Sequence, residues 1–377
     1  MSNPTNTWTD GRPAVSGAGH RRGEAGYRRI TLALFAAGMT TFVSMYAVQA
    51  VLPALTTDFG VSAAQSTLAV SATTGLLACA IIPASVLSER FGRVPVMGWS
   101  AVLALLIGVA VGFAPSMEVL IILRALQGVA LAGVPATAMA YLAEEVHGAS
   151  LGAAMGRYIA GTTIGGLAGR VLASTVLDVS TWRWAMEAAA GACLVFTVLF
   201  LWLAPRSEHF RPQRIGLVTT ARHLLGHLRT LDLVALFATG GLLMGAFVSA
   251  YNLIGFRLVA EPFALPQSLV GLVFVLYLSG TVSAGLAGRL ADRWGRAQVM
   301  LVCEVVALIG LVITLVDALP VILVGMLLFT AGFFAAHAVA SSWVGRLARA
   351  HRAEASALYL FAYYVGSSVL GALAAVV

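Results

Sequence analysis

The stretch GRLADRWGRA, at residues 288–297, is a short polar run between two long apolar segments. A similar stretch, SVLSERFGRV, occupies residues 85–94, and its Glu89 precedes Asp292 of the other copy by 203 positions. Each copy follows the second long apolar segment of its own half of the chain. A repeat of this length indicates one helical module that is used twice.

The composition around these two stretches is that of a membrane protein. Of the residues 59% are hydrophobic and 10% are charged, the mean hydropathy is +0.91, and many apolar runs reach the roughly 20 residues that cross a bilayer. All 23 basic residues are arginines, and all but four (Arg124, Arg170, Arg183 and Arg257) fall in or toward the segments that we place in the cytosol. This asymmetry predicts a multi-pass protein of the cell inner or plasma membrane, with a cytosolic N-terminus. The net charge of +7 therefore reflects topology and does not indicate nucleic-acid binding.

The order of the apolar segments predicts four regions. Residues 1–29 are expected to be a disordered cytosolic tail, 30–204 a six-helix N-terminal half, 205–232 a cytosolic linker with an interfacial helix near 216–230, and 233–377 a C-terminal half with helices 7–11. The predicted spans are 31–55, 66–88, 95–113, 117–143, 150–177, 184–204, 233–258, 268–288, 297–316, 320–343 and 353–377. A complete second repeat would end near residue 407 (204 plus 203), so a twelfth helix is apparently missing.

The pattern G-x-L-x-D-R-x-G-R at 288–296 resembles the loop signature of the major facilitator superfamily; the first copy has Ser85 and Glu89 in place of its Gly and Asp. The resemblance implies an all-α fold with two six-helix repeats around a central cavity, and secondary active transport by alternating access. It also implies that both loops close the cytosolic side, with Glu89 near the N-terminus of span 11 and Asp292 near that of span 5. A plain positively charged hairpin is the alternative. The residues assigned to these gating loops are Glu89, Arg90, Gly92, Arg93, Gly288, Asp292, Arg293, Gly295 and Arg296.

Three further stretches look like the bacterial branch linked to acriflavine sensitivity: GGLAGR at 165–170, WRW at 182–184 and YVGSS at 364–368. This resemblance implies proton-coupled export of a small organic or amphipathic compound by a monomer in the lipid bilayer. Uptake of a nutrient, a transport-inactive sensor and a truncated remnant are the alternatives. The sequence has no P-loop, nucleophile elbow or metal-ligand cluster, so we expect no enzymatic activity, no cofactor and no metal.

Two sets of residues are candidates for proton coupling. Arg124 lies about 10 Å into span 4, and with Gln127 and Gly128 it resembles the R-x-x-Q-G motif of proton-coupled members. It is expected either to lower the pKa of a partner acid, Glu118 or Glu187, or to bind backbone carbonyls structurally. In span 5, a glycine every fourth residue over 161–169 predicts close helix packing and partly resembles the antiporter motif of exporters, with Arg170 where that motif has its final Gly. Arg170 is then a buried cation or an anchor at the outer interface.

The remaining polar positions inside the spans are candidates for the substrate cavity. The aromatic and amide side chains among them suit an amphipathic substrate, with interhelical hydrogen bonding as the alternative. These positions are Tyr46, Gln49, Tyr251, Asn252, His337 and Tyr363. Glu304 in span 9 is expected to be a snorkelling or paired structural acid.

Overall fold

The helices of the computed structural model follow the apolar segments closely, and the structure describes residues 19–210, 217–348 and 352–374. The first half contains α1 (Ala25–Tyr46), η1 (Ala47–Val51), α2 (Leu52–Phe59), α3 (Ala63–Phe91), α4 (Arg93–Gly112), α5 (Met117–Leu131), α6 (Gly133–Glu145), α7 (Gly148–Val179) and α8 (Trp182–Leu203). The second half, after α9 (Leu217–His227), contains α10 (Leu231–Val259), α11 (Gln267–Leu272), η2 (Val273–Leu276), α12 (Tyr277–Trp294), α13 (Arg296–Ile313), α14 (Leu319–Leu347) and α15 (Arg352–Leu373).

Ten helical segments among the described residues are long and apolar enough to cross a membrane. The predicted fifth span, α7, is a further helix of 32 residues that is rich in glycine. Its glycines pack directly on the backbone of α1: a Cβ at Gly161 or Gly165 would lie 2.5 or 2.8 Å from α1 backbone atoms. The close packing predicted for this helix face therefore brings α7 into contact with α1.

The two repeated stretches are mostly helical, which corrects the prediction that they form loops. The helix α3 continues to Phe91 and α12 to Trp294. The chain turns only at Gly92 and Gly295, whose φ angles of 95° and 91° favour glycine. Gly288, expected at the turn, is an ordinary helical residue of α12.

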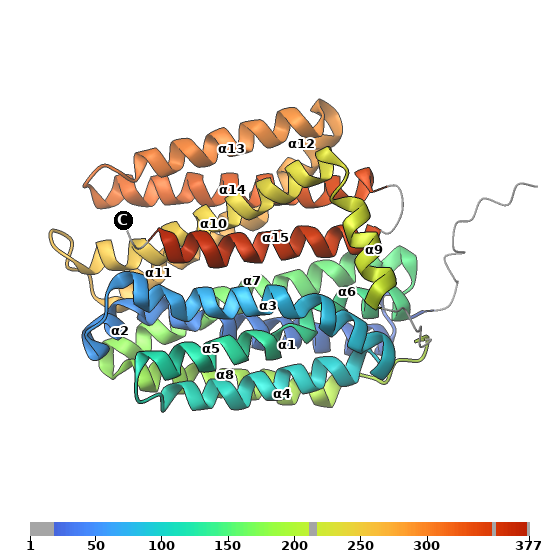
Figure 1. The fold of residues 1–377 in the computed structure, drawn as a ribbon, viewed down its shortest axis with the longest axis horizontal. Helices are drawn as coiled ribbons and strands as arrows, with labels where there is room; N and C mark the ends of the chain where they lie inside the picture. The colour runs from blue at the N-terminus through green and yellow to red at the C-terminus, as the bar shows by residue number, and fades with distance from the viewer. Residues whose placement is uncertain (1–18, 211–216, 349–351, 375–377) are drawn as a thin grey trace, which may run out of the picture.

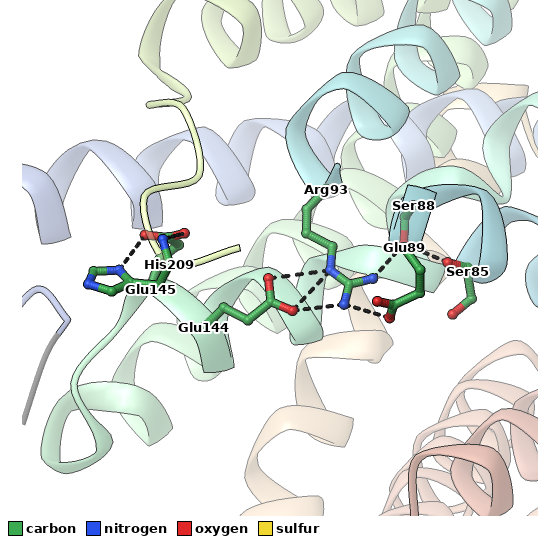
Figure 2. A network of polar contacts seen from close by, with 7 residues as sticks. All are labelled: Ser85, Ser88, Glu89, Arg93, Glu144, Glu145 and His209. Carbon is green, nitrogen blue, oxygen red and sulfur yellow. Dashed lines mark hydrogen bonds and ion pairs between the residues drawn. The ribbon is translucent and has the colours of Figure 1, made fainter. Parts of the chain in front are cut away.

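The start of the described chain is also more ordered than predicted. Residues 1–18 lie outside the described part, but α1 already begins at Ala25, so the predicted disordered tail over 1–29 is wrong for residues 19–29. The backbone N–H of His20 donates to the carbonyl of Glu145, 2.9 Å away. The side chain of Glu145 in turn binds His209 of the linker, at 2.9 and 3.0 Å (Figure 2). In the linker, α9 lies within the predicted interfacial helix.

The two halves lie side by side along the bundle (Figure 1), and the buried core shows where they meet. We call the end of the bundle where α2 and α11 lie the α11 end, and the opposite end, beside α9, the α9 end. One large apolar cluster contains residues of both halves, including η1, α2 and α11. Three smaller clusters each belong to one half, and they include residues near the α9 end such as Tyr27, Leu233 and Val299. The halves therefore share a core toward the α11 end and pack separately toward the α9 end.

Candidate functional site

Two amide side chains join the halves at equivalent positions of the repeat. Gln49 of η1 donates from Nε2 to Oδ1 of Asn252 on α10, over 2.5 Å, and the two residues are 203 positions apart. This is also the offset between Glu89 and Asp292. Both amides are buried, with 3% and 1% of their surfaces exposed. Equivalent residues of two repeats meet where the pseudo-twofold axis of such a fold passes, so this contact lies at the axis between the halves.

Arg170 of α7 extends the contact into a chain of three side chains. Its Nε donates to Oε1 of Gln49 over 2.7 Å, and one terminal nitrogen donates to the carbonyl of Gly166 over 2.7 Å. The side chain is 2% exposed. The sequence leaves open a buried cation or an interface anchor for Arg170, and in the structure it is a buried cation.

Three aromatic rings surround the Arg170 guanidinium. Its central carbon lies 4.3 Å from the ring centroid of Tyr46 and 4.8 Å from those of Phe274 and Tyr277. Tyr46 belongs to the first half, whereas the other two rings belong to the second. Cation–π attraction at these distances partly offsets the cost of burying the charge, but it supplies no countercharge.

The other predicted cavity residues continue this aromatic cluster through the second half. Tyr251 packs against Phe274 and shares a hydrogen bond of 2.6 Å with the hydroxyl of Thr330. His337 on α14 lies further toward the α9 end; its Nδ1 is 2.9 Å from the hydroxyl of Tyr359. Its ring packs against that of Tyr363, with centroids 4.7 Å apart. The predicted cavity residues thus form one continuous group through ring contacts, which we call the central group, with the two amides and Arg170 at the axis between the halves.

Arg124 has a different environment from Arg170. Its guanidinium donates to the backbone carbonyls of Ala69, Ser44 and Met45 over 3.0, 2.8 and 2.6 Å, and also to the side chain of Gln127. It is 2% exposed and connects α1, α3 and α5 within the first half. This arrangement matches the structural alternative, in which the arginine binds carbonyls.

Neither predicted acid partner pairs with Arg124 in the described structure. Its partners are the four acceptors above, whereas Glu187 packs over Gly112 and its Oε1 is buried without a hydrogen-bond partner in the described chain. A small cavity beside Arg124 and Gln127 extends to Cys193 inside the first half. Glu304, expected to snorkel or to be paired, likewise has a buried Oε1 without a partner among the described residues.

The first copy of the repeated stretch is held together by Arg93, which is 5% exposed (Figure 2). One terminal nitrogen donates to both Glu144 and Glu89 over 2.7 Å, and the other donates to the hydroxyl of Ser88 over 2.6 Å.

In the second copy an acid, and not an arginine, has two ionic partners. Asp292 forms ion pairs with Arg296 at 2.9 Å and with Arg346 of α14 at 3.4 Å.

These partners all lie in the same half as the residue they bind. The sequence predicts that Glu89 lies near the N-terminus of span 11 and Asp292 near that of span 5, but the structure pairs each with arginines of its own half. Separation of the halves toward the α9 end accounts for this difference.

Sequence reasoning missed two features of the central group. Phe274 and Tyr277 lie in an apolar run, where nothing distinguishes them from ordinary core residues. The pairing of Gln49 with Asn252 had a signal that was available, because their spacing equals the repeat offset.

The comparisons with known proteins agree with this fold. The family model of the Major Facilitator Superfamily matches residues 34–372, and the chain belongs to this superfamily of membrane transporters. The chain is 43% identical to the inner membrane transport protein YnfM of Escherichia coli, over 94% of this chain and 85% of that protein. It is 40% identical to an uncharacterized MFS-type transporter, YybF, of Bacillus subtilis, over 93% and 87%. Among solved structures, the nucleoside transporter NupG has the same fold, with a TM-score of 0.74 and 16% identity over 91% of this chain and 90% of that one.

Proposed function

We propose that this transporter works by alternating access and exports a small organic compound in exchange for protons. The observation that carries the proposal is the chain Arg170–Gln49–Asn252, which joins the halves at the axis between them. A substrate bound there would contact both halves. Its binding energy would therefore favour one relative arrangement of the halves over another, which is what alternating access requires.

In this proposal the α9 end faces the cytosol. The arginines of both repeated stretches lie at that end, as the positive-inside bias favours. The described conformation would then be open toward the cytosol and closed outside by the contacts at the α11 end. One such contact runs from the backbone N–H of Ser268 to the carboxylate of Asp178, over 3.0 Å. Opening the outer side would break this contact and the bond between Gln49 and Asn252.

Export is favoured over uptake by the packing of α7 on α1, since the glycines that make this contact are those that partly resemble the antiporter motif. Arg124, Gln127 and Arg170 are the residues that we assign to proton coupling. Because an arginine stays charged at working pH, these residues would act on the charge balance and hydrogen bonding of the site, without carrying the proton themselves.

Transport in everted membrane vesicles tests the proposal. Vesicles with and without the protein receive an acid-inside proton gradient and one of three labelled probes: an acridine dye, 2-naphthoate or xylose. We expect at least one probe to accumulate only with the protein, and a protonophore to abolish the accumulation. Accumulation only in right-side-out vesicles with an acid exterior would replace export by uptake. Absence of proton-dependent movement of every probe in both orientations would refute the proposal.

A further inference from the structure

Arg170 differs from the arginines with ion pairs, and also from Arg124 with its four acceptors, in what its charge contacts. Arg93, Arg183, Arg257 and Arg296 each form an ion pair with a carboxylate. For Arg170, the contacts within the described chain are an amide oxygen, one backbone carbonyl and three rings, without an ion pair. A charge buried to this degree without a countercharge is costly, and inside a membrane it is most often functional.

The hydrogen-bonding groups left over at this place are donors. A guanidinium has five N–H donors, and the described contacts of Arg170 use only two of them. The amide nitrogen of Asn252 is buried and has no hydrogen-bond partner in the described structure. Donors from both halves are thus available beside a positive charge, which selects a ligand with negatively charged acceptor oxygens.

The geometry points to an organic carboxylate as the substrate: we propose that Arg170 and Asn252 bind its carboxylate and that the rings of Tyr46, Phe274 and Tyr277 contact its apolar body. This inference rests on the proposed transport function and adds the chemical class of the substrate. An inorganic anion would use the charge alone, whereas an organic carboxylate would also bring an apolar body to the three rings beside the guanidinium. A guanidinium also matches the two oxygens of a carboxylate in a bidentate arrangement.

The repeat shows that the site has one cation and not two. Tyr158 and Tyr359, like Gly165 and Gly366, are 201 positions apart, so the position equivalent to Arg170 in the second half is Gly371. A Cβ at Gly371 would lie 3.1 Å from the side chain of Val248 and 3.7 Å from the amide nitrogen of Asn252, so the second half has no side chain at this position. One cation on one side of the axis suits a monocarboxylate with its apolar part directed elsewhere.

Binding of matched ligand pairs to the purified full-length protein in detergent tests this inference. Isothermal titration calorimetry would compare benzoate, phenylacetate, 2-naphthoate and indole-3-acetate, each with its neutral amide, and sodium sulfate. We expect at least one carboxylate to bind about tenfold more tightly than its amide, as a charge-assisted hydrogen bond would give. Arg170→Gln should remove this preference, and Arg170→Lys should retain part of it.

Arg157→Gln is the matched control, because Arg157 lies on the same helix but contacts Thr31 and the ring of Tyr27, away from the central group. It should leave the preference for carboxylates unchanged. Melting of each ligand-free variant checks that it folds; a preference that persists in folded Arg170→Lys but is lost in folded Arg170→Gln supports the inference. Three results would overturn it: no carboxylate binds better than its amide, the preference survives Arg170→Gln, or sulfate displaces the bound carboxylate at equal concentration.

This test and the vesicle test can fail separately. Proton-dependent transport of a neutral or cationic probe, with no preference for carboxylates, would leave the transport proposal standing and refute the anion site. A preference for carboxylates that depends on Arg170, without movement of any probe, would support the anion site and refute the transport proposal.

Discussion

Equivalent positions of the repeat, on α5 in the first half and α14 in the second, are stabilised by different interactions. α5 begins at Met117 and α14 at Leu319, an offset of 202, so the positions of Arg124 and Gln127 correspond to Met326 and Phe329. In the first half a buried guanidinium binds four acceptors on three helices. In the second half the same region is packed with aromatic rings: that of Phe247 lies 5.8 Å from that of Phe329. One helical arrangement thus accepts hydrogen bonds or aromatic packing at the same place.

The ion pairs near the turns at Gly92 and Gly295 also differ between the two halves. With the offset of 202, Glu144 corresponds to Arg346. The first half therefore has one buried arginine between two acids, and the second has one exposed aspartate between two arginines. The first arrangement is enclosed and joins α3, α4 and α6, whereas Asp292 is 60% exposed. The comparison indicates a rigid turn in the first half and a weakly held one in the second.

The largest loss of stability should come from the substitution Arg124→Met. Replacing Arg124 by Met, the residue at the equivalent position of the second half, removes all four of its hydrogen bonds. Hydrogen bonds to charged groups contribute about 1.5–3 kcal/mol each, and partial relaxation reduces their sum, so we expect a loss of roughly 3 kcal/mol. The measurement is the melting midpoint in detergent, with Arg157→Met as the control. An equal midpoint for the two variants would show that hydrogen bonding by Arg124 does not stabilise the first half.

A smaller loss should follow from Arg93→Gln. The change leaves Glu89 and Glu144 close together without the shared cation. Their side chains are 21% and 27% exposed, so water partly compensates and the expected loss is about 1–2 kcal/mol. Adding Glu144→Gln should recover part of this loss, because it removes the remaining repulsion. A double variant that melts lower than Arg93→Gln alone would contradict the proposed role of the charges.

In the second half, Phe247→Leu should cost about 1 kcal/mol, since it preserves most of the buried volume but removes the ring stacked 3.9 Å from that of Phe333. The melting midpoint again gives the measurement. The exposed Leu242 on the same helix supplies a control, Leu242→Ala, which faces away from the stack. A loss no larger than that of the control would mean that the rings contribute only bulk to the packing of this half.

Much of the fold could be predicted from the sequence because apolar length and repetition determine it. The predicted spans differ from the helices by a few residues at most ends, and the largest differences have local causes. The repeated stretches were predicted as loops because they are polar, but their leucine, alanine, arginine and glutamate residues favour a helix, and only Gly92 and Gly295 require the turn. Residues 19–24 lack periodicity, yet the backbone of His20 pairs with that of Glu145 and His147, which no local pattern reveals.

The candidate site could be predicted in its members but not in its pairings. Tyr46, Gln49, Tyr251 and Asn252 are recognisable as polar residues in apolar spans. Whether Arg170 contacts them depends on the orientation of α7 about its own axis relative to α1, and tertiary packing determines that orientation. The partner of Arg124 was sought among acids because charge suggests countercharge, but three backbone carbonyls of the neighbouring helices α1 and α3 accept its hydrogen bonds instead.

The smallest effect on stability, and the clearest test of the two turns, concerns Asp292. Because its ion pairs are exposed, Asp292→Asn should change the free energy of unfolding by less than about 0.5 kcal/mol. Its effect on conformation should be larger: if Asp292 meets the N-terminus of α7 when the α9 end closes, losing the carboxylate disfavours the closed state by about 1 kcal/mol, or roughly fivefold in population. Spin labels at the exposed Gly152 and Gly288, in a cysteine-free background, would measure the distance between the halves. Glu89→Gln is the matched variant of the first half, where Arg93 already holds the carboxylate. Distance distributions that stay unchanged in Asp292→Asn would remove the second turn from gating, and an equal shift in both variants would remove the contrast between the two halves.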